Sequence, residues 1–364
     1  MDRHDIPKEI KAEHVAQMHQ EDLKVEHLYG CKGMTYWCDE NRNTAFCLIE
    51  APNKKAIQDM HDHVHGEYPH DIIEVDKNIV ESFLGRIQDP EKAKDTKLNI
   101  INDPAFRVIM LIETSNYLNR LEGNQFSVFY QKFHNSVLKT LKKFNGRIVN
   151  NNNNSYLVSF KSVTDAVLGA LKIQYKFKYV TPKFDSVSRK LKIALGSGIP
   201  VTNKNNIFEE AITFTTRMCE VTKEQLVISS EVKALYESEN RNITIDKNLI
   251  RTLKPSEEEF LIHLMDYVER IWNIPNFNIT SFSKDLGYSK SQLYRKLISL
   301  TGQSPNNFIK EFRLHKALKM LHKQHGNISE TAYRSGFNSP AYFSKCFLEK
   351  YGVLPSKYIQ QHIV

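Results

Sequence analysis

The sequence has 364 residues, of which 41% are hydrophobic and 25% charged, and these proportions are typical of a globular protein rather than a disordered or fibrous chain. At this length we expect two or three domains, each with its own core. No apolar run approaches the roughly 18 residues of a membrane span, no signal-peptide core follows Met1, and the five cysteines have no CxxC spacing. We therefore expect a cytoplasmic protein with reduced thiols and no membrane partner.

Positive charge is concentrated at the carboxyl end of the chain. The sequence has 50 Lys and Arg against 42 Asp and Glu, a formal net charge of +8. Residues 261–364 contain 14 of the basic and 6 of the acidic side chains, which is the whole excess. Residues 1–76 contain 8 basic and 16 acidic side chains, a net charge of −8. The carboxyl-terminal region is therefore the candidate for contact with a polyanion such as DNA, and the amino-terminal region is not.

The first ninety residues predict a small α+β unit. We expect an amphipathic helix over 11–29, two strands around a polar turn over 37–50, a second helix over 52–65 and a final strand over 71–75. These elements describe most of a ferredoxin-like sandwich within residues 1–88. Only residues 1–5 are left for the strand that should precede the first helix, so either the sequence begins late or that strand is truncated.

Histidines are concentrated in this first region, which holds eight of the 14 within its first 70 residues. His61 and His65 are four residues apart in a predicted helix, which places both imidazoles on one helix face at a chelating spacing. His63 points elsewhere. Composition alone leaves ordinary surface histidines as the commoner explanation.

Short motifs along the first 75 residues add to the histidine pattern. They include residues 1–5, residues 46–52, and His61-x-x-x-His65-Gly66. These segments resemble a small family of nickel-binding ferredoxin-like proteins. The resemblance implies a site for Ni²⁺ or another divalent transition metal, with four candidate ligands: His4, His19, His61 and His65. Imidazole suits nickel, copper and zinc alike. Cys47 is a further soft donor, although a cysteine in an apolar strand is more often part of the core.

A linker is expected within residues 76–107, around its two Asp-Pro pairs. Residues 104–240 then predict a second α+β unit with a long helix, a hairpin around five asparagines, and alternating strands and helices. The expected strands cover 107–112, 146–149, 156–160, 190–196 and 225–229, and the expected helices cover 125–144, 163–177, 209–221 and 230–237.

This order of elements resembles the catalytic domain of class III nucleotidyl cyclases. Those enzymes hold two metal ions on two aspartates, but the matching positions here fall at 110–112 and at Asn154, with Glu113 only a neighbour. Arg217 matches an arginine that steadies the transferring phosphoryl group, whereas Thr213 replaces the asparagine one turn earlier. The resemblance therefore implies a second ferredoxin-like sandwich without catalytic residues, no enzymatic activity, and a binding or dimerisation role. A homodimer through either α+β unit is expected.

The last hundred residues contain one helix-turn-helix pattern twice, over 279–297 and over 328–347. Gly287 and Gly336 suit the left-handed turn between the two helices of each copy, where a side chain would clash. Serines placed to cap the second helices follow at Ser289 and Ser339. The turn glycines are 49 residues apart, and the prolines that end each copy are 50 apart, so the unit is duplicated. A helix that begins at residue 305 joins the copies.

Three further features of this region occur at definite spacings: Leu293-Tyr294-Arg295, Arg313, and Gly336-Phe337 followed by Tyr342-Phe343-Ser344. Residues 264–358 resemble the DNA-binding domain of AraC-type transcription regulators. The resemblance implies an all-α double helix-turn-helix domain at 258–364, duplex DNA as partner, and RNA polymerase as a candidate partner. The alternative is a helical bundle that binds protein.

The second helix of each copy is expected to enter the major groove. The candidate DNA-contacting residues are Ser289, Ser291, Gln292, Tyr294 and Arg295 in the first copy and Ser339, Ala341 and Lys345 in the second. Arg295 is the foremost of them because a guanidinium can address guanine at two atoms.

Three functions are thus open. The first is a DNA-binding transcription regulator whose two leading domains sense a signal and set its assembly. The second is a nucleotide cyclase or nucleotide-binding protein fused to a DNA reader, which the absent carboxylates disfavour. The third is a metal-binding protein for storage or delivery, which the charge distribution and the duplicated motif disfavour.

Overall fold

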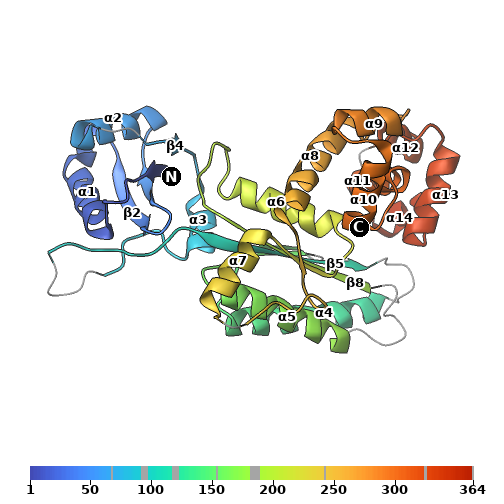
Figure 1. The fold of residues 1–364 in the computed structure, drawn as a ribbon, viewed down its shortest axis with the longest axis horizontal. Helices are drawn as coiled ribbons and strands as arrows, with labels where there is room; N and C mark the ends of the chain where they lie inside the picture. The colour runs from blue at the N-terminus through green and yellow to red at the C-terminus, as the bar shows by residue number, and fades with distance from the viewer. Residues whose placement is uncertain are drawn as a thin grey trace.

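A computed structural model describes residues 1–66, 69–91, 97–116, 123–152, 155–180, 189–241, 243–323 and 326–362 of the chain. These residues form three units in chain order: an α/β unit, a larger α/β unit and a helical unit (Figure 1). Within the described ranges, no helix combines the length and apolar character needed to cross a membrane.

The first unit is built on a four-stranded antiparallel sheet with the strand order β2-β3-β1-β4. Its strands are β1 (Asp2–Asp5), β2 (Lys32–Asp39), β3 (Thr44–Glu50) and β4 (Asp71–Ile72), and its helices are α1 (Ala12–Val25), the short 3-10 helix η1 (Glu26–Tyr29) and α2 (Lys54–His65). The strand that the sequence left in doubt is therefore present. It is short, yet it is an inner strand, because β3 pairs with one edge and β4 with the other.

Both faces of this sheet are buried, which explains the nearly unbroken apolar runs in β2 and β3. Tyr36 and Cys47 lie on the face that packs against α1. Trp37, Phe46 and Leu48 lie on the opposite face, because successive side chains of a strand alternate in direction, and they pack against the second unit.

The segment expected to be an irregular linker contains a helix, α3 (Lys77–Leu84). Asp76 caps it by accepting hydrogen bonds from the backbone N–H groups of Asn78 (2.8 Å) and Ile79 (3.3 Å). Its apolar side chains are buried between the first and second units. The sequence analysis did not predict this helix, because eight residues are too few to show a clear helical period. The linker predicted around the two Asp-Pro pairs lies after it, at residues 89–90 and 103–104.

The second unit contains a six-stranded sheet with the strand order β10-β9-β8-β5-β7-β6. Its strands are β5 (Arg107–Asn116), β6 (Arg147–Asn152), β7 (Ser155–Phe160), β8 (Arg189–Gly198), β9 (Leu226–Ile228) and β10 (Arg251–Thr252). Its helices are α4 (Gly123–Lys143), α5 (Val163–Val180), α6 (Glu209–Val221) and α7 (Ser230–Glu239). Pairing is antiparallel from β8 through β5 and β7 to β6, and parallel among β8, β9 and β10. The two-residue β10 was not predicted.

The third unit is entirely helical and contains the expected duplication. Its helices are α8 (Pro255–Ile271), α9 (Ile279–Asp285), α10 (Lys290–Thr301), α11 (Pro305–His322), α12 (Ile328–Arg334), α13 (Pro340–Tyr351) and α14 (Pro355–His362). Gly287 (φ 75°) and Gly336 (φ 80°) adopt the left-handed conformation that the turn requires. The copies are therefore α9 with α10 and α12 with α13, joined by α11.

Helix α6 links the cores of all three units, so the units do not have fully separate cores. Near its amino end, Phe208 and Ala211 pack with Trp37 and other residues of the first sheet. Near its carboxyl end, Met218 and Val221 pack with residues of the helical unit, among them α8 and α10. Figure 1 shows α6 between the first unit and the helical unit, over one face of the second sheet.

Candidate nucleic-acid interface and metal centre

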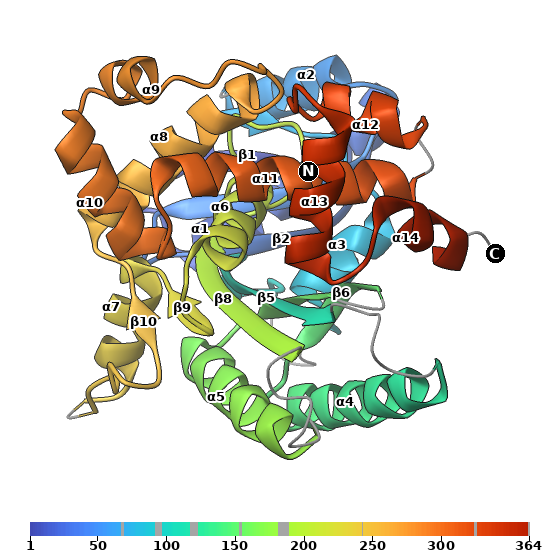
Figure 2. The ribbon, with the colours of Figure 1, turned by 90° about the vertical axis from the view of Figure 1, so that its right-hand side faces the viewer.

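Helix α10 packs into the helical unit through its apolar face and presents its polar face to solvent. Leu293 and Leu297 are fully buried. All five residues predicted as DNA contacts in the first copy are exposed, with Tyr294 at 50% of its surface. Figure 2 shows α10 near one end of α11 and α13 near the other. The structure therefore leaves the predicted reading face of α10 open.

Two of these residues also stabilise the start of α10. The Ser289 hydroxyl accepts a hydrogen bond from the backbone N–H of Gln292 (3.3 Å), and the Ser289 N–H donates to Gln292 Oε1 (3.0 Å). This reciprocal capping satisfies backbone groups that the helix leaves unpaired. Among the described residues, Arg295 makes one weak hydrogen bond, from its Nε to the backbone oxygen of Ser291 at 3.4 Å, which leaves its terminal nitrogens available to a ligand.

In α13, Ser339 caps the helix by accepting from the backbone N–H of Tyr342 (3.3 Å), while Ala341 and Lys345 are exposed. Tyr342, which is 55% exposed on the same helix, was not among the predicted DNA contacts. Aligning the two capping serines, 50 residues apart, would have identified it, because Tyr342 then takes the place of Gln292.

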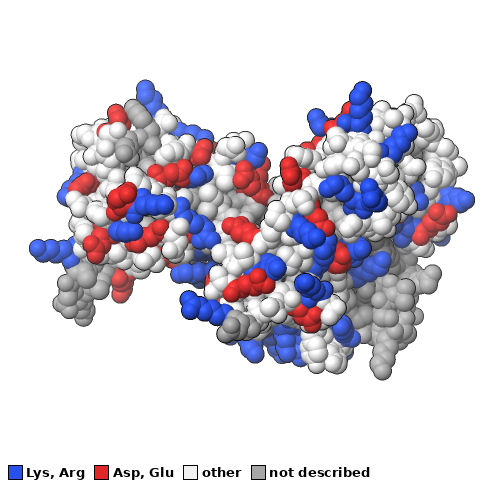
Figure 3. Space-filling view, viewed as in Figure 1, with Lys and Arg blue, Asp and Glu red and all other residues white. Residues whose placement is uncertain are grey.

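The helical unit also carries the charge that the sequence predicted for it. On the face seen in Figure 3, Lys and Arg predominate over the helical unit, whereas both signs are mixed over the first unit. Phosphate contacts require this excess of positive charge.

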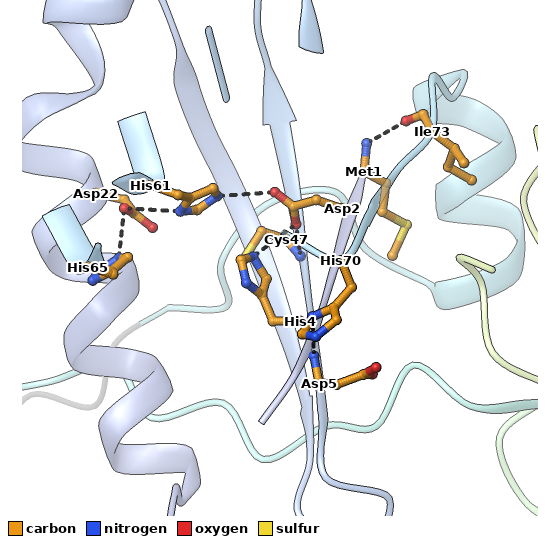
Figure 4. A network of polar contacts seen from close by, with 10 residues as sticks. All are labelled: Met1, Asp2, His4, Asp5, Asp22, Cys47, His61, His65, His70 and Ile73. Carbon is orange, nitrogen blue, oxygen red and sulfur yellow. Dashed lines mark hydrogen bonds and ion pairs between the residues drawn. The ribbon is translucent and has the colours of Figure 1, made fainter. Parts of the chain in front are cut away.

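A second polar centre is buried in the first unit, between its sheet and α2 (Figure 4). The His61 Nε2 atom lies 3.1 Å from Asp2 Oδ2, and its Nδ1 atom lies 3.4 Å from Asp22 Oδ1. The same Asp22 oxygen contacts His65 Nε2 at 2.9 Å. On the other side, His4 Nε2 lies 3.7 Å from Asp2 Oδ1. One network therefore joins three histidines and two aspartates.

Two groups of donor atoms in this network are close enough to hold a metal ion. Asp2, His4 and Cys47 form one group, and Asp22, His61 and His65 form the other, with the donor atoms of each group within 4.8 Å of one another. Sheet pairing makes the first group, because Asp2 lies opposite Cys47 in the β1–β3 register and His4 follows two residues later on the same strand face. Helix α2 and residue 22 of α1 make the second group.

The electrostatics of the network centre on His61. Burial lowers the pKa of this imidazole, but the contacts with the carboxylates of Asp2 and Asp22 outweigh burial and raise the pKa to about 10. Burial raises the pKa of Asp2, but its contacts with His4 and His61 outweigh burial and lower the pKa below its ordinary range. At neutral pH His61 is therefore an imidazolium between two carboxylates.

The residues of this network fit a divalent transition metal. A metal ion between the carboxylates would replace the charge of the imidazolium, and the donors are imidazole, carboxylate and thiol. The buried His4 Nε2 and His61 Nδ1 atoms have no hydrogen-bond partner among the described residues. Burial raises the pKa of the Cys47 thiol well above its ordinary value, so this sulfur is protonated without a metal.

The structure separates His19 from the other predicted ligands. Its Nε2 atom lies 3.2 Å from Asp89 Oδ2, in the segment that follows α3, and its ring packs against Tyr36. His19 belongs to neither group of donor atoms. The prediction missed Asp2 and Asp22 as members of the network, although Asp2-x-His4 within a strand was a signal that could have indicated the first.

In the second unit, the first-strand position of the cyclase resemblance is apolar and buried, at Met110, Leu111 and Ile112. Asn154, the hairpin position, lies outside the described residues. Arg217 pairs through Nη2 with Asp266 Oδ1 of α8 at 2.6 Å, so this guanidinium binds the helical unit.

Two regions of the chain match known families. Residues 282–361 match the family described as a helix-turn-helix domain, and residues 1–75 match the family described as the nickel responsive protein SCO4226-like. The chain therefore carries an AraC-type helix-turn-helix domain at its carboxyl end and an SCO4226-like domain at its amino end.

Curated relatives cover parts of the chain. Histidine kinase P4 of Formosa agariphila is 38% identical over 107 residues, which are 29% of this chain and 8% of that protein. The HTH-type transcriptional regulator MtrA of Neisseria gonorrhoeae is 28% identical over 181 residues, with 45% of this chain and 57% of that protein covered. The chain thus spans less than two thirds of the length of either relative.

Solved structures also resemble parts of the chain. A transcriptional regulator with an AraC-type DNA-binding domain from Chromobacterium violaceum covers 30% of this chain and 97% of its own, at 22% identity and a TM-score of 0.28. A guanylyl cyclase domain from Blastocladiella emersonii covers 37% of this chain and 84% of its own, at 14% identity and a TM-score of 0.31. The cyclase resemblance of the second unit stays a prediction.

Proposed function

We propose that the protein is a sequence-specific, DNA-binding transcription regulator of the AraC type. The observation that carries the proposal is the duplicated second helix. Helices α10 and α13 each bury an apolar face in the helical unit and each present a polar face to solvent. The net charge of +8 in residues 261–364 supplies the attraction to phosphates that such helices need.

In the proposed complex, Arg295 is the main base-reading residue of α10, because its terminal nitrogens are free to bind guanine. Ser289, Ser291, Gln292 and Tyr294 contact base edges or phosphates beside it. In α13, Lys345 and Ser339 contact phosphates, and the methyl group of Ala341 packs against a thymine methyl.

Selection of bound fragments from random duplex DNA by the full chain tests this proposal. We expect an enriched motif with two half-sites about one helical turn apart, because two reading helices joined by one rigid helix address neighbouring major grooves. Recovery of no motif above a library treated without protein would contradict the proposal.

We also propose that the first unit binds Ni²⁺ or another divalent transition metal. The two groups of donor atoms are its candidate ligand sets: Asp2, His4 and Cys47 in one, and Asp22, His61 and His65 in the other. When bound, the metal supplies a concentrated positive charge between the buried carboxylates. His61 and Cys47 must release their protons before they can donate electron pairs, so binding releases protons.

Calorimetry with nickel, copper and zinc tests the metal site. The His61→Ala/His65→Ala double variant should lose metal binding, whereas the His27→Ala control, at an exposed histidine outside both groups, should retain it. Equal uptake by the double variant and the control would rule out the site. Each titration should also release protons, detected as a dependence of the heat on the buffer.

Metal binding is proposed to alter DNA affinity through α6. The amino end of this helix packs against the sheet that carries Asp2 and Cys47, and its carboxyl end packs against the helical unit. Coupling energies between sites are typically about 1–3 kcal/mol, equivalent to roughly 5- to 150-fold in affinity. DNA binding by wild type and by His61→Ala/His65→Ala, with and without metal, measures this coupling. A wild-type affinity that metal leaves unchanged would favour the alternative of a metal-storage or delivery protein.

The remaining assignments complete the proposal. Residues 1–88, 104–240 and 258–364 are the proposed domains, and the first two are proposed to be ferredoxin-like sandwiches, in agreement with their strand orders. The second domain is proposed to have no cyclase activity, because its first-strand position is apolar. We also propose that the protein forms a homodimer through either α/β domain, contacts RNA polymerase and is located in the cytoplasm.

A further inference from the structure

A small cavity lies where the second unit meets the helical unit. Its volume is about 230 Å³, and it is lined by one residue of β8 and by residues of α11 and α13. The lining residues are Lys190, Lys310, Glu311, Cys346, Glu349 and Lys350. Neither the DNA-reading face nor the metal network includes this cavity.

Four lysines surround this space. Lys190, Lys310 and Lys350 line it directly, and Lys192 follows Lys190 on the same face of β8. Burial lowers the pKa of Lys350 to about 8, and repulsion from the three other ammonium groups contributes in the same direction. The lysines are therefore close enough to destabilise one another's charges.

The polar partners in the structure satisfy only part of this charge. Lys350 pairs with Glu311. Lys192 donates to the backbone oxygens of Glu220 (3.3 Å) and Thr222 (2.5 Å) at the carboxyl end of α6. Lys190 and Lys310 have no ion-pair or side-chain hydrogen-bond partner in the part of the chain that the structure describes. Glu349, the other acidic residue, is exposed.

We propose that this cavity binds a phosphate-bearing anion through Lys190 and Lys310, with Lys350 and Lys192 contributing to the positive field. Lysine binds phosphate as a point charge with three donors, and several lysines on one recess suit the charge of a diphosphate. A volume of about 230 Å³ leaves room for phosphate groups beside these lysines.

The anion would bridge two units. Lys190 belongs to the second unit, whereas Lys310 and Lys350 belong to the helical unit. The phosphate has two sources with the same chemistry, a free phosphorylated small molecule and the backbone of bound DNA. The recessed shape favours the free anion, because a lysine that contacts duplex DNA usually projects from a surface.

Calorimetric titration of the full chain with pyrophosphate, at constant ionic strength and without DNA, tests the proposal. We expect a single binding event that Lys190→Gln and Lys310→Gln each weaken at least 10-fold. Lys172→Gln, at an exposed lysine of α5 outside the cavity, is the matched control and should bind as wild type does. Binding should also tighten as the pH falls through about 8, because Lys350 takes up its proton over this range.

A second arm separates the two sources. If DNA is the source, Lys190→Gln reduces the slope of log affinity against log salt concentration by about one, the value expected for one lost phosphate contact. In that case pyrophosphate does not bind the free protein. If pyrophosphate binding is absent and the salt dependence is unchanged, the cavity binds no phosphate and the inference is wrong. Equal pyrophosphate binding by wild type, Lys190→Gln and Lys310→Gln would also overturn it. The pyrophosphate arm uses no DNA, so its result is independent of the proposed regulatory function.

Discussion

Glu220 holds the helical unit against the second unit, and its replacement by glutamine should destabilise that contact. It lies in the last turn of α6, and its Oε1 atom is 3.6 Å from His315 Nε2 and 3.4 Å from Lys319 Nζ, both on α11. Glu113 and Lys192 of the second unit lie near the same carboxyl. Burial raises the pKa of Glu220, but the contacts with His315 and Lys319 outweigh burial and lower it to about 2.

The pKa gives the magnitude and the sign of the effect. A carboxyl with a pKa of about 2 in the folded chain and 4.5 in the unfolded chain favours folding by about 3 kcal/mol at neutral pH. Because the folded pKa is depressed, this contribution is present above pH 4.5 and is lost as the pH falls towards 2. At pH 3 it should be less than half of its neutral value. Glu220→Gln keeps the side-chain volume, so we expect a loss of about 1–3 kcal/mol at pH 7.

Urea unfolding followed by tryptophan fluorescence measures the change, since Trp37 reports the first unit and Trp272 the helical unit. The matched control is Glu237→Gln, which removes a partly exposed pair with Lys233 (3.8 Å) and should change stability by under about 0.5 kcal/mol. If Glu220→Gln lowers the free energy of unfolding at pH 7 no more than its control does, the contact of Glu220 with His315 and Lys319 does not stabilise the fold. The same conclusion follows if the loss of stability is equal at pH 3 and at pH 7.

Three further results are expected. Arg295→Ala should weaken binding to a selected DNA site by about 1–3 kcal/mol and relax the preference at one base pair, whereas Lys345→Ala, at a proposed phosphate contact, should weaken all sequences alike, as gel-shift titrations will show. Phe208→Ala, at a side chain that is 1% exposed, should lower the free energy of unfolding by about 3–5 kcal/mol, while Tyr179→Ala, at 70% exposure, should not. Incubation with ATP or GTP and manganese should yield no cyclic nucleotide, and a yield that tracks purified protein would refute the loss of cyclase chemistry.

The helix-turn-helix copies were predictable because their signals are local. A glycine in the left-handed turn, a serine at the helix start and leucines one turn apart each act within a few residues of sequence. Gly287, Ser289 and Leu293 therefore indicated the turn, the cap and the buried face of α10 without knowledge of the rest of the chain. The same reasoning placed His61 and His65 on one face of α2.

The metal network could be predicted only in part, because most of its contacts are between residues far apart in sequence. Asp2 reaches His61 because β1 is an inner strand and α2 crosses above it, a separation of 59 residues. Cys47 joins through the β1–β3 register, and Asp22 joins because α1 packs beside α2. The same packing turns His19 towards Asp89, which no spacing in the sequence indicates.

The sequence by itself determined the elements whose periodicity and caps act along one helix or strand, the duplication and the segregation of charge. Only the tertiary structure decided how the units share their cores. Leu111 and Ala194 are buried under the helical unit, and Phe208 under the first, although each reads as an ordinary apolar residue of its own unit. A hydrophobic side chain gains the same free energy from leaving water whichever neighbour covers it, so its pattern predicts burial but not the partner.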